Sequence, residues 1–325
     1  MSALKVTVPA DGAPREVGQD EKRPSRRHLR KASRPYVFIA PAVVFEFFIH
    51  ILPMVIGIGI SLLGLTLFYV HYWTAAPFIG LQNYVVALNF GGAAGSALLH
   101  SFLITVAYTV LVVGSAWVLG MTAALLLNGK FRGRSLFRTL FLIPYAIPAY
   151  VEIIAWNFML QQNTGSVNAV LRALHISNPP FWLIGTNAFW SMVMTAAWRS
   201  WPFAFLFLLA GLQTIAPDLY EAASLEGASK WQQFRLITLP MLKPVNVVLL
   251  LVTFLWTFND FNTPYVLFGA APPPAADLLS LHIYINSFVN WNFGLGSAMS
   301  VLLLIFLFIV SIIYLRIFQS GGETQ

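Results

Sequence analysis

The stretch EAASLEGASKWQQFRLITLPMLKP, residues 221–244, is the one long polar interruption in the second half of a strongly apolar chain. Pro217, just before it, suits the first turn of a helix, and Asp218 and Glu221 would lie near the positive end of that helix's dipole. Gly227 is the residue type that ends many helices in a left-handed conformation. A helix is therefore predicted to begin at Pro217 and to end at Gly227.

A second helix is predicted directly after this glycine. Ser229, with Gln232 three residues later, forms the pattern of a capping box, in which each side chain bonds the other residue's backbone N–H. Pro240 and Pro244 would break the helical structure that follows. Residues 214–245, hereafter the knuckle, are therefore predicted to fold as a helix–turn–helix element between two membrane spans.

The composition identifies an integral membrane protein. Of 325 residues, 58% are hydrophobic and only 10% are charged, whereas soluble globular domains carry about 25% charged residues. The absence of cysteine excludes disulfides and thiolate metal sites. The net charge of +7 does not point to nucleic acid, because the basic residues gather at the ends of predicted spans. No nucleic-acid partner is expected.

Six segments have the roughly 20 mostly apolar residues that a membrane-spanning helix needs. They are residues 36–60, 101–127, 138–160, 188–213, 246–268 and 297–317. The predicted fold is an all-α integral membrane protein with six transmembrane helices. A basic tail over 1–34 precedes a transmembrane domain over 35–320, and a short tail over 321–325 follows it. Apolar residues after position 61 suggest that the first helix continues beyond the membrane.

The Lys and Arg residues predict the orientation, because cytoplasmic loops of membrane proteins carry more of them. Nine lie in the tail, four in the loop 128–138, three in the knuckle and one, Arg316, near the C-terminus, together 17 of 19. The loops on the opposite side are residues 61–100, 161–187 and 269–296. They hold only Arg172. Both termini and the knuckle are therefore expected in the cytosol, at the inner or plasma membrane, with the basic tail on anionic lipid.

The knuckle resembles the EAA loop of ABC-importer permeases. The matching positions are Glu221-Ala222-Ala223, Gly227-Ala228 and Ile237-Thr238-Leu239-Pro240. Other stretches resemble the carbohydrate-uptake, binding-protein-dependent permeases in particular. They are FIGLQNY at 78–84, GKFRGRSLFRTLFLIPY at 129–145, AGLQ at 210–213 and the residues 294–298. The resemblance covers about residues 36–317.

This resemblance implies the type I ABC-importer permease fold, with the knuckle as a cytosolic coupling helix docked on a separate ATPase. The residues expected to make up the coupling element are Glu221, Ala222, Ala223, Ser224, Leu225, Glu226, Gly227 and Ala228. The chain has no GxxxxGK[ST] phosphate loop, so ATP and Mg²⁺ are expected on the partner and no cofactor on this chain. The expected partners are a second EAA-type permease in a heterodimer, two ABC ATPase subunits, an extracytoplasmic solute-binding protein or lipoprotein, membrane lipid and a sugar-like substrate.

Two helical stripes are candidates for the substrate path. The first, in the fourth span, is Ala196, Arg199, Ser200 and Phe203, and the second, in the fifth, is Thr253, Trp256, Thr257 and Asp260, with Asn259 beside it. Each stripe has the spacing i, i+3, i+4, i+7, which places its members on one helix face. Hydroxyl groups and an aromatic face suit a sugar, and the resemblance implies that these spans line the translocation path. The alternative is that the stripes only pack helices together.

Four ionisable residues lie within spans, where charge is costly and often functional. They are Glu46, Glu152, Arg199 and Asp260. At 1.5 Å per residue, Arg199 and Asp260 would differ in height by roughly 6 Å, so we hypothesise that they pair, since each alone would be a buried unpaired charge. The alternative is that Arg199 binds an anionic substrate such as a phosphorylated polyol. Glu46 and Glu152 are expected to be protonated or hydrogen-bonded to a neighbouring helix, with a proton relay as the alternative.

These patterns predict the permease subunit of an ATP-driven, binding-protein-dependent importer for a sugar or sugar-like solute. The six histidines are scattered without ligand spacing, and neither GxSxG nor HExxH occurs. No catalytic or metal-binding residue is therefore expected, and the chain is predicted not to be an enzyme. The competing interpretations are an ion-coupled secondary transporter that uses its membrane carboxylates and a multipass membrane enzyme.

Overall fold

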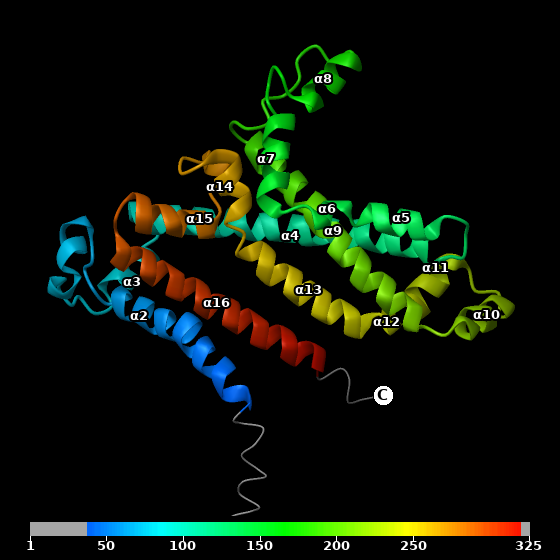
Figure 1. The fold of residues 1–325 in the computed structure, drawn as a ribbon, viewed down its shortest axis with the longest axis horizontal. Helices are drawn as coiled ribbons and strands as arrows, with labels where there is room; N and C mark the ends of the chain where they lie inside the picture. The colour runs from blue at the N-terminus through cyan, green and yellow to red at the C-terminus, as the bar shows by residue number, and fades with distance from the viewer. Residues whose placement is uncertain (1–37, 320–325) are drawn as a thin grey trace, which may run out of the picture. The chain divides into compact units, whose positions relative to one another are not determined.

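The computed structural model describes residues 38–319 (Figure 1). The two tails predicted over 1–34 and 321–325 lie outside the described residues. The chain divides into two compact units, Met1–Val55 and Ile56–Gln325. Apart from two isolated bridges, the regular structure of residues 38–319 is entirely helical.

The first unit, as far as it is described, is the beginning of one apolar helix, Phe38–Ser61. Within this helix a π turn, η1 (Phe47–Ile51), leads into α2 (Leu52–Ser61). Glu46 pairs with His50 of the following turn, with 3.2 Å between Oε2 and Nδ1, and both side chains are exposed. Of the two states expected for Glu46, the hydrogen bond to a neighbouring helix is not found, because its partner in the described chain lies on the same helix, and the protonated state stays a prediction.

The second unit is organised around α4 (Ala93–Asn128) and α9 (Asn187–Thr214), which form its most extensive helix pair. Close approach of the two helices depends on Gly120. A Cβ added there would lie only 2.7 Å from the backbone nitrogen of Phe205, so any larger residue would push the helices apart. Phe205 and Leu208 are fully buried in the apolar core beside this contact.

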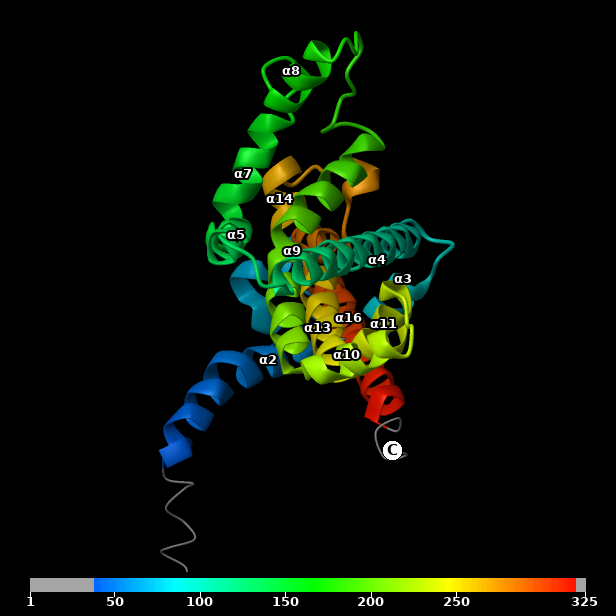
Figure 2. The ribbon, with the colours of Figure 1, turned by 90° about the vertical axis from the view of Figure 1, so that its right-hand side faces the viewer.

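The other elements of the second unit are shorter or pack around this pair. In chain order they are η2 (Leu67–Ala75), α3 (Gln82–Leu88), α5 (Arg134–Phe141), α6 (Ile143–Ala146), α7 (Ala149–Met159), α8 (Ser166–Ala173), α10 (Pro217–Leu225), α11 (Lys230–Gln233), η3 (Phe234–Thr238), α12 (Leu239–Met241), α13 (Lys243–Phe258), α14 (Asn262–Phe268), η4 (Pro274–Ala276), α15 (Leu279–Tyr284), η5 (Ile285–Val289) and α16 (Phe293–Gln319). Figures 1 and 2 show α7 and α8 extending away from the α4–α9 pair.

Five helices within residues 38–319 are long and apolar enough to cross a membrane. They are Phe38–Ser61, Ala93–Asn128, Asn187–Thr214, Lys243–Phe268 and Phe293–Phe318. The single helix predicted over 138–160 is wrong, because the chain there forms α5, α6 and α7. Ile147, between α6 and α7, is extended at φ −79° and ψ 134°, since Pro148 disfavours a helical conformation in the residue before it.

The prediction that the first helix continues past residue 61 is also wrong, because that helix ends at Ser61. Two residues of the FIGLQNY stretch account for this end. The amide of Asn83 donates to the carbonyl oxygens of Ser61 and Leu63, both at 2.9 Å. The hydroxyl groups of Ser61 and Tyr84 lie 2.6 Å apart. The backbone carbonyls freed at the end of the helix thus find side-chain donors.

Candidate functional site

The two predicted stripes face a common recess. A cavity of about 230 Å³ is lined by Tyr145, Ile147, Ala149, Arg199, Ser200, Phe203, Thr253, Trp256 and Thr257. Six of these nine residues were predicted, three on α9 and three on α13. Ala196 does not line this cavity, because it is buried in the apolar core beside α4. The helical spacing therefore predicted the lining of this cavity well, with an error at the first position of the first stripe.

A second, larger cavity continues from the first and shares Ala149, Arg199 and Trp256 with it. Its volume is about 710 Å³. The predicted residues Asn259 and Asp260 line it, together with side chains of α16 that the sequence did not single out. These are Leu304, Leu307, Phe308 and Ser311.

Aromatic rings form one wall where the two cavities meet. The ring centroids of Phe203 and Trp256 lie 5.0 Å apart, and those of Tyr145 and Phe203 lie 5.9 Å apart. The indole of Trp256 is exposed despite these contacts. An exposed ring held by its neighbours offers a flat apolar surface to the face of a sugar ring.

The predicted pairing of Arg199 with Asp260 is confirmed. Nη2 of Arg199 lies 3.2 Å from Oδ2 of Asp260, and the Asp260 side chain is only 5% exposed. The pair lies where the two cavities meet, because Arg199 lines both of them. The positive charge beside the recess is therefore matched by a buried negative charge.

Asp260 holds three further hydrogen bonds that sequence reasoning missed. The hydroxyl of Tyr108 on α4 donates to Oδ2 at 2.7 Å, and the hydroxyl of Thr263 donates to the same oxygen at 2.5 Å. The backbone N–H of Thr263 donates to Oδ1 at 3.1 Å. Tyr108 could have been noticed as a phenol in an apolar span, but its partner depends on how α4 packs.

The break between α13 and α14 brings the Asp260 carboxylate to this position. Pro264 lacks the N–H that would bond the carbonyl of Asp260 four residues earlier in a helix. That carbonyl instead accepts a hydrogen bond from the Ser280 hydroxyl at 2.9 Å. The carboxylate of Asp260 in turn caps the first turn of α14 through Thr263. The predicted span over 246–268 is thus two helices joined at the site.

Glu152 on α7 is a second buried carboxylate near this pair. Its side chain is 2% exposed, and neither of its oxygens has a hydrogen-bond partner in the described structure. The charges of Arg199 and Asp260 both influence the ionisation of its carboxyl group. Of the two states expected for Glu152, protonated or hydrogen-bonded to a neighbouring helix, the hydrogen bond is absent, and the protonated state stays a prediction.

The knuckle folds as predicted at both helix ends. Helix α10 begins at Pro217, and Gly227 adopts φ +85°, which only glycine tolerates easily. Ala228 N–H bonds the carbonyl of Ala223, and Gly227 N–H bonds that of Ser224, which is the Schellman arrangement. The predicted capping box of Ser229 is present in both directions. Glu221, however, lies in the second turn of α10, so only Asp218 is in the first.

The two prolines of the knuckle do not interrupt the chain as strongly as predicted. Pro240 lies in the first turn of α12 and Pro244 in the first turn of α13. Leu242, between these helices, keeps a helical φ of −82°. The chain from Lys230 to Phe258 is thus a nearly continuous helical rod with shifts in register.

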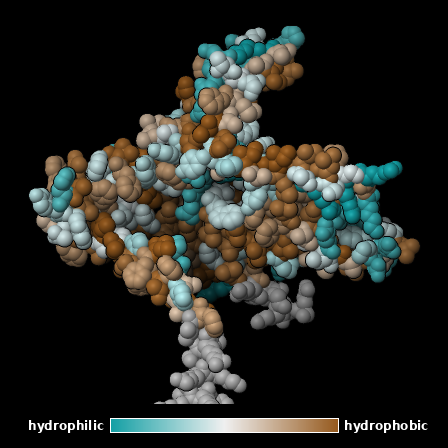
Figure 3. Space-filling view, in the orientation of Figure 1, coloured by the Kyte–Doolittle hydropathy of each residue, from teal (hydrophilic) through white to brown (hydrophobic). Residues whose placement is uncertain are grey.

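Side-chain hydrogen bonds tie the two helices of the knuckle together. The buried amide of Gln233 donates to Ser224 Oγ at 2.8 Å and to the carbonyl of Ala228 at 3.1 Å. The hydroxyl groups of Tyr220 and Thr238 lie 3.0 Å apart. Leu225, at the end of α10, is 91% exposed. The knuckle is therefore internally braced and presents an apolar tip. Hydrophilic side chains gather around α10 and α11 in Figure 3.

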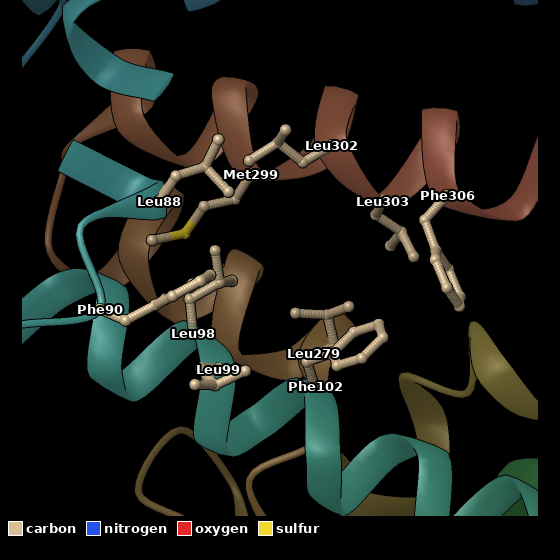
Figure 4. A pocket seen from close by; sticks show the side chains of 10 residues that line it. All are labelled: Leu88, Phe90, Leu98, Leu99, Phe102, Leu279, Met299, Leu302, Leu303 and Phe306. Atoms are coloured by element: carbon tan, nitrogen blue, oxygen red, sulfur yellow. The ribbon is translucent and has the colours of Figure 1, made fainter. Parts of the chain in front are cut away.

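A further pocket, between α3, α4, α15 and α16, contrasts with the polar recess (Figure 4). Its lining consists only of leucine, phenylalanine and methionine side chains. They are Leu88, Phe90, Leu98, Leu99, Phe102, Leu279, Met299, Leu302, Leu303 and Phe306. A solute rich in hydroxyl groups would find no side-chain hydrogen-bond partner there, so this pocket is not a candidate for the substrate path. Within residues 38–319, no group of three His, Cys, Asp or Glu side chains could hold a metal ion.

Long apolar helices around a polar recess, with a braced polar knuckle, define a multi-pass membrane permease. Residues 116–320, which include the knuckle and the recess-lining helices α9, α13 and α16, match the family described as "binding-protein-dependent transport system inner membrane component". The chain belongs to this family.

Three relatives resemble nearly the whole chain. The trehalose/maltose transport system permease protein MalF of Thermococcus litoralis is 35% identical over 300 residues, which are 92% of this chain and 98% of MalF. The inner membrane ABC transporter permease protein YcjO of Escherichia coli is 34% identical, over 88% of this chain and 94% of YcjO. The sn-glycerol-3-phosphate transport system permease protein UgpA of Agrobacterium fabrum is 30% identical, over 83% and 89%.

Solved structures show the same fold. A chain of a bacterial ABC transporter involved in the import of the acidic polysaccharide alginate superposes with a TM-score of 0.76, covering 91% of this chain and 98% of that one. A second structure, of the alginate transporter with an alginate pentasaccharide-bound periplasmic protein, gives 0.74. Both are 19% identical to this chain. The predicted type I ABC-importer permease fold is therefore confirmed.

The family also decides between the competing interpretations. The chain is a permease subunit of an ABC importer and not an enzyme, and the ATPase activity resides in a separate subunit. An ion-coupled secondary transporter is not supported. Of the three membrane carboxylates that suggested it, Asp260 pairs with Arg199 and Glu46 pairs with His50.

Proposed function

We propose that this permease moves a neutral saccharide or sugar-like solute through the recess between α9 and α13. An extracytoplasmic binding protein would deliver the solute. A second EAA-type permease would complete the path, and two ATPase subunits, which hold ATP and Mg²⁺, would drive it. Both termini and the knuckle would face the cytosol, as the distribution of Lys and Arg predicts.

The observation that carries this proposal is the shared lining of one recess by residues from both sides of the knuckle. Ser200 and Phe203 come from α9, before the knuckle, and Thr253 and Trp256 come from α13, after it. A displacement of the knuckle would therefore move both walls of the recess together. Such a linkage suits alternating access, in which a packed element changes between two arrangements.

The charge of the site favours a neutral solute. The guanidinium of Arg199 is matched by Asp260, and the carboxyl group of Glu152 lies nearby. An anionic solute would have to displace a paired carboxylate that accepts three other hydrogen bonds. Breaking a buried pair in this way is costly. The MalF relative, named for trehalose and maltose, therefore suggests the substrate class better than the UgpA relative, named for glycerol 3-phosphate.

Uptake by the complete importer tests this proposal. Proteoliposomes that contain both permeases, the ATPases and internal ATP would be supplied with the binding protein and with radiolabelled maltose, trehalose, sn-glycerol 3-phosphate or an oligouronate. We expect ATP-dependent uptake of a neutral sugar. Uptake of only the anionic solutes would contradict the proposal.

The variant Asp260→Asn separates the two roles of Arg199. If the carboxylate neutralises the site, its loss leaves the guanidinium uncompensated, and the relative uptake of anionic solutes rises. If Arg199 already binds an anionic substrate, the same variant leaves that selectivity unchanged.

A further inference from the structure

The segment that links α2 to α3 exposes large aromatic side chains. Phe68 is 88% exposed and Phe78 is 73% exposed, and Tyr72 and Trp73 between them are exposed as well. We call residues 66–78 the aromatic segment. Large exposed apolar patches mark surfaces that contact a partner or a membrane.

The sequence around this segment is free of formal charge. Between Glu46 and Lys130 there is no Asp, Glu, Lys or Arg. Protein–protein interfaces ordinarily surround their apolar centre with a polar rim, and loops in water carry charged side chains. The aromatic segment instead combines apolar rings with the polar tips of Tyr72 and Trp73, a composition that is enriched where membrane meets water.

Backbone contacts fix the segment at the end of a membrane-crossing helix. Thr66 pairs with Asn292 in an isolated bridge, and the N–H of Gly294 donates to the carbonyl of Leu65 at 3.0 Å. Helix α16 begins at Phe293, directly beside this bridge, and Figure 1 shows η2 and the start of α16 at the same end of the second unit. The aromatic rings therefore lie at the level where an apolar helix ends.

A second aromatic group lies beside the same bridge. Trp291 adopts φ +55°, a conformation that is uncommon for a bulky residue, and its side chain remains exposed, as does that of Phe288. The rings of both pack against Phe293, at centroid distances of 6.0 and 5.6 Å. Exposed aromatic rings thus occur on two chain segments at one height.

We propose that the aromatic segment and Trp291 bind the phospholipid surface, with their rings at the boundary between headgroups and acyl chains. The argument is one of continuity along the chain, because the segment follows directly on the apolar helix Phe38–Ser61, whose large side chains are exposed as far as Ile58. The segment would anchor the permease at a fixed depth. The proposal rests on α16 crossing the membrane and is independent of the solute that the importer carries.

The absence of cysteine allows a direct test. Single cysteines at Phe68, Tyr72 and Phe78 would carry a nitroxide spin label in the complete importer, reconstituted in phosphatidylcholine–phosphatidylglycerol vesicles with cysteine-free partners. Collision of the label with oxygen, which dissolves in lipid, and with a water-soluble nickel chelate reports its depth. Thr164, exposed in the loop before α8, serves as the aqueous control, and Ile313, exposed on α16, as the lipid control.

We expect labels at all three positions to give a depth between those of the two controls. A depth equal to that of Thr164 would overturn the proposal, because the rings would then face water. Protection from both reagents, or a change when the solute-binding protein is added, would also overturn it by showing that protein covers the segment. ATP-dependent solute uptake by each labelled importer confirms that the variants are folded.

Discussion

At the scale of single residues, one carboxylate holds three helices together. Asp260 accepts hydrogen bonds from Tyr108 on α4, Arg199 on α9 and Thr263 on α14. Two of these donors, Tyr108 and Arg199, lie far from Asp260 in the sequence, so the carboxylate links the recess to the packing of the bundle. Its removal should therefore affect stability as well as transport.

We expect Arg199→Met to destabilise the permease by roughly 3–5 kcal/mol, because it leaves the Asp260 charge buried and unpaired. The double variant Arg199→Met/Asp260→Asn should be less destabilised than this single variant. Thermal unfolding of the purified importer in detergent measures both. A double variant at least as destabilised as Arg199→Met would show that the two side chains do not stabilise each other.

Trp256→Ala should weaken solute-dependent transport by up to about tenfold, because an aromatic contact is worth roughly 0.5–1.5 kcal/mol beyond its buried area. The matched control is Trp190→Ala, on α9, which lies outside both cavities and is similarly exposed. Solute uptake by the reconstituted importer, measured at increasing solute concentration, compares the effects of Trp256→Ala and Trp190→Ala. An equal effect of both variants would indicate that the stripe serves packing alone.

The helical period made the lining of the recess by α9 and α13 predictable from sequence. The partners of Asp260 on other helices were missed, because they depend on tertiary contacts. Residues at i, i+3, i+4 and i+7 share a face in any helix, so Arg199 and Asp260 were expected on facing surfaces. Tyr108 and Ser280 meet Asp260 only through the packing of other helices. No local pattern in the sequence specifies these contacts.

At the scale of elements, the knuckle joins the two walls of the recess through one braced unit. Helix α9 leads into α10, the Schellman turn at Gly227 reverses the chain, and the helical rod from Lys230 continues into α13. The buried Gln233 amide holds both arms. Force applied at the tip would therefore reach α9 and α13 together.

Gly227→Ala should strain the turn by about 1–2 kcal/mol, since an alanine at φ +85° meets its own carbonyl. We expect normal membrane insertion and subunit assembly but less solute moved per ATP hydrolysed. Gly227→Pro, which cannot reach positive φ and also loses the hydrogen bond to Ser224, should be more severe.

The control for this prediction is Gly129→Ala. Gly129 has φ −62°, and a Cβ there meets no atom within 4 Å. Parallel measurements of ATPase rate and uptake in proteoliposomes give the coupling ratio of each variant. A normal ratio of solute uptake to ATP hydrolysis in Gly227→Pro would contradict the claim that the knuckle moves α9 and α13 as one rigid unit.

Local turn chemistry made the helix ends of the knuckle predictable. The breaks in the third predicted span, residues 138–160, were not predicted. The glycine and the capping box act within a few residues, so sequence alone located both helix ends. In the segment 138–160 the apolar content was correct, but Pro148 breaks the helix through its effect on Ile147. Hydropathy counts apolar residues and does not register such a break.

At the scale of the whole molecule, the basic loops and the knuckle lie at one end of the second unit. Asn128, at the end of α4, and Lys230, in the knuckle, line the same cavity. Arg138, on α5, donates to the carbonyl of Leu127 at 2.7 Å. The positive-inside rule therefore predicts that this end faces the cytosol.

Single cysteines test this orientation in intact cells. Ser135→Cys, in the first turn of α5, should be protected from a membrane-impermeant maleimide, whereas Thr164→Cys, before α8, should react. Permeabilised cells should label at both positions. The opposite pattern would reverse the topology.

The central claim is that a separate ATPase subunit binds the knuckle and thereby moves the helices that line the recess. The most direct measurement places a photo-crosslinking amino acid at Leu225, the exposed tip of α10, and irradiates the complete importer with and without ATP. We predict a crosslink to the ATPase subunit and a loss of solute uptake in proportion to its yield. A knuckle that crosslinks to no second protein in either nucleotide state, in an importer that still transports, would contradict the account.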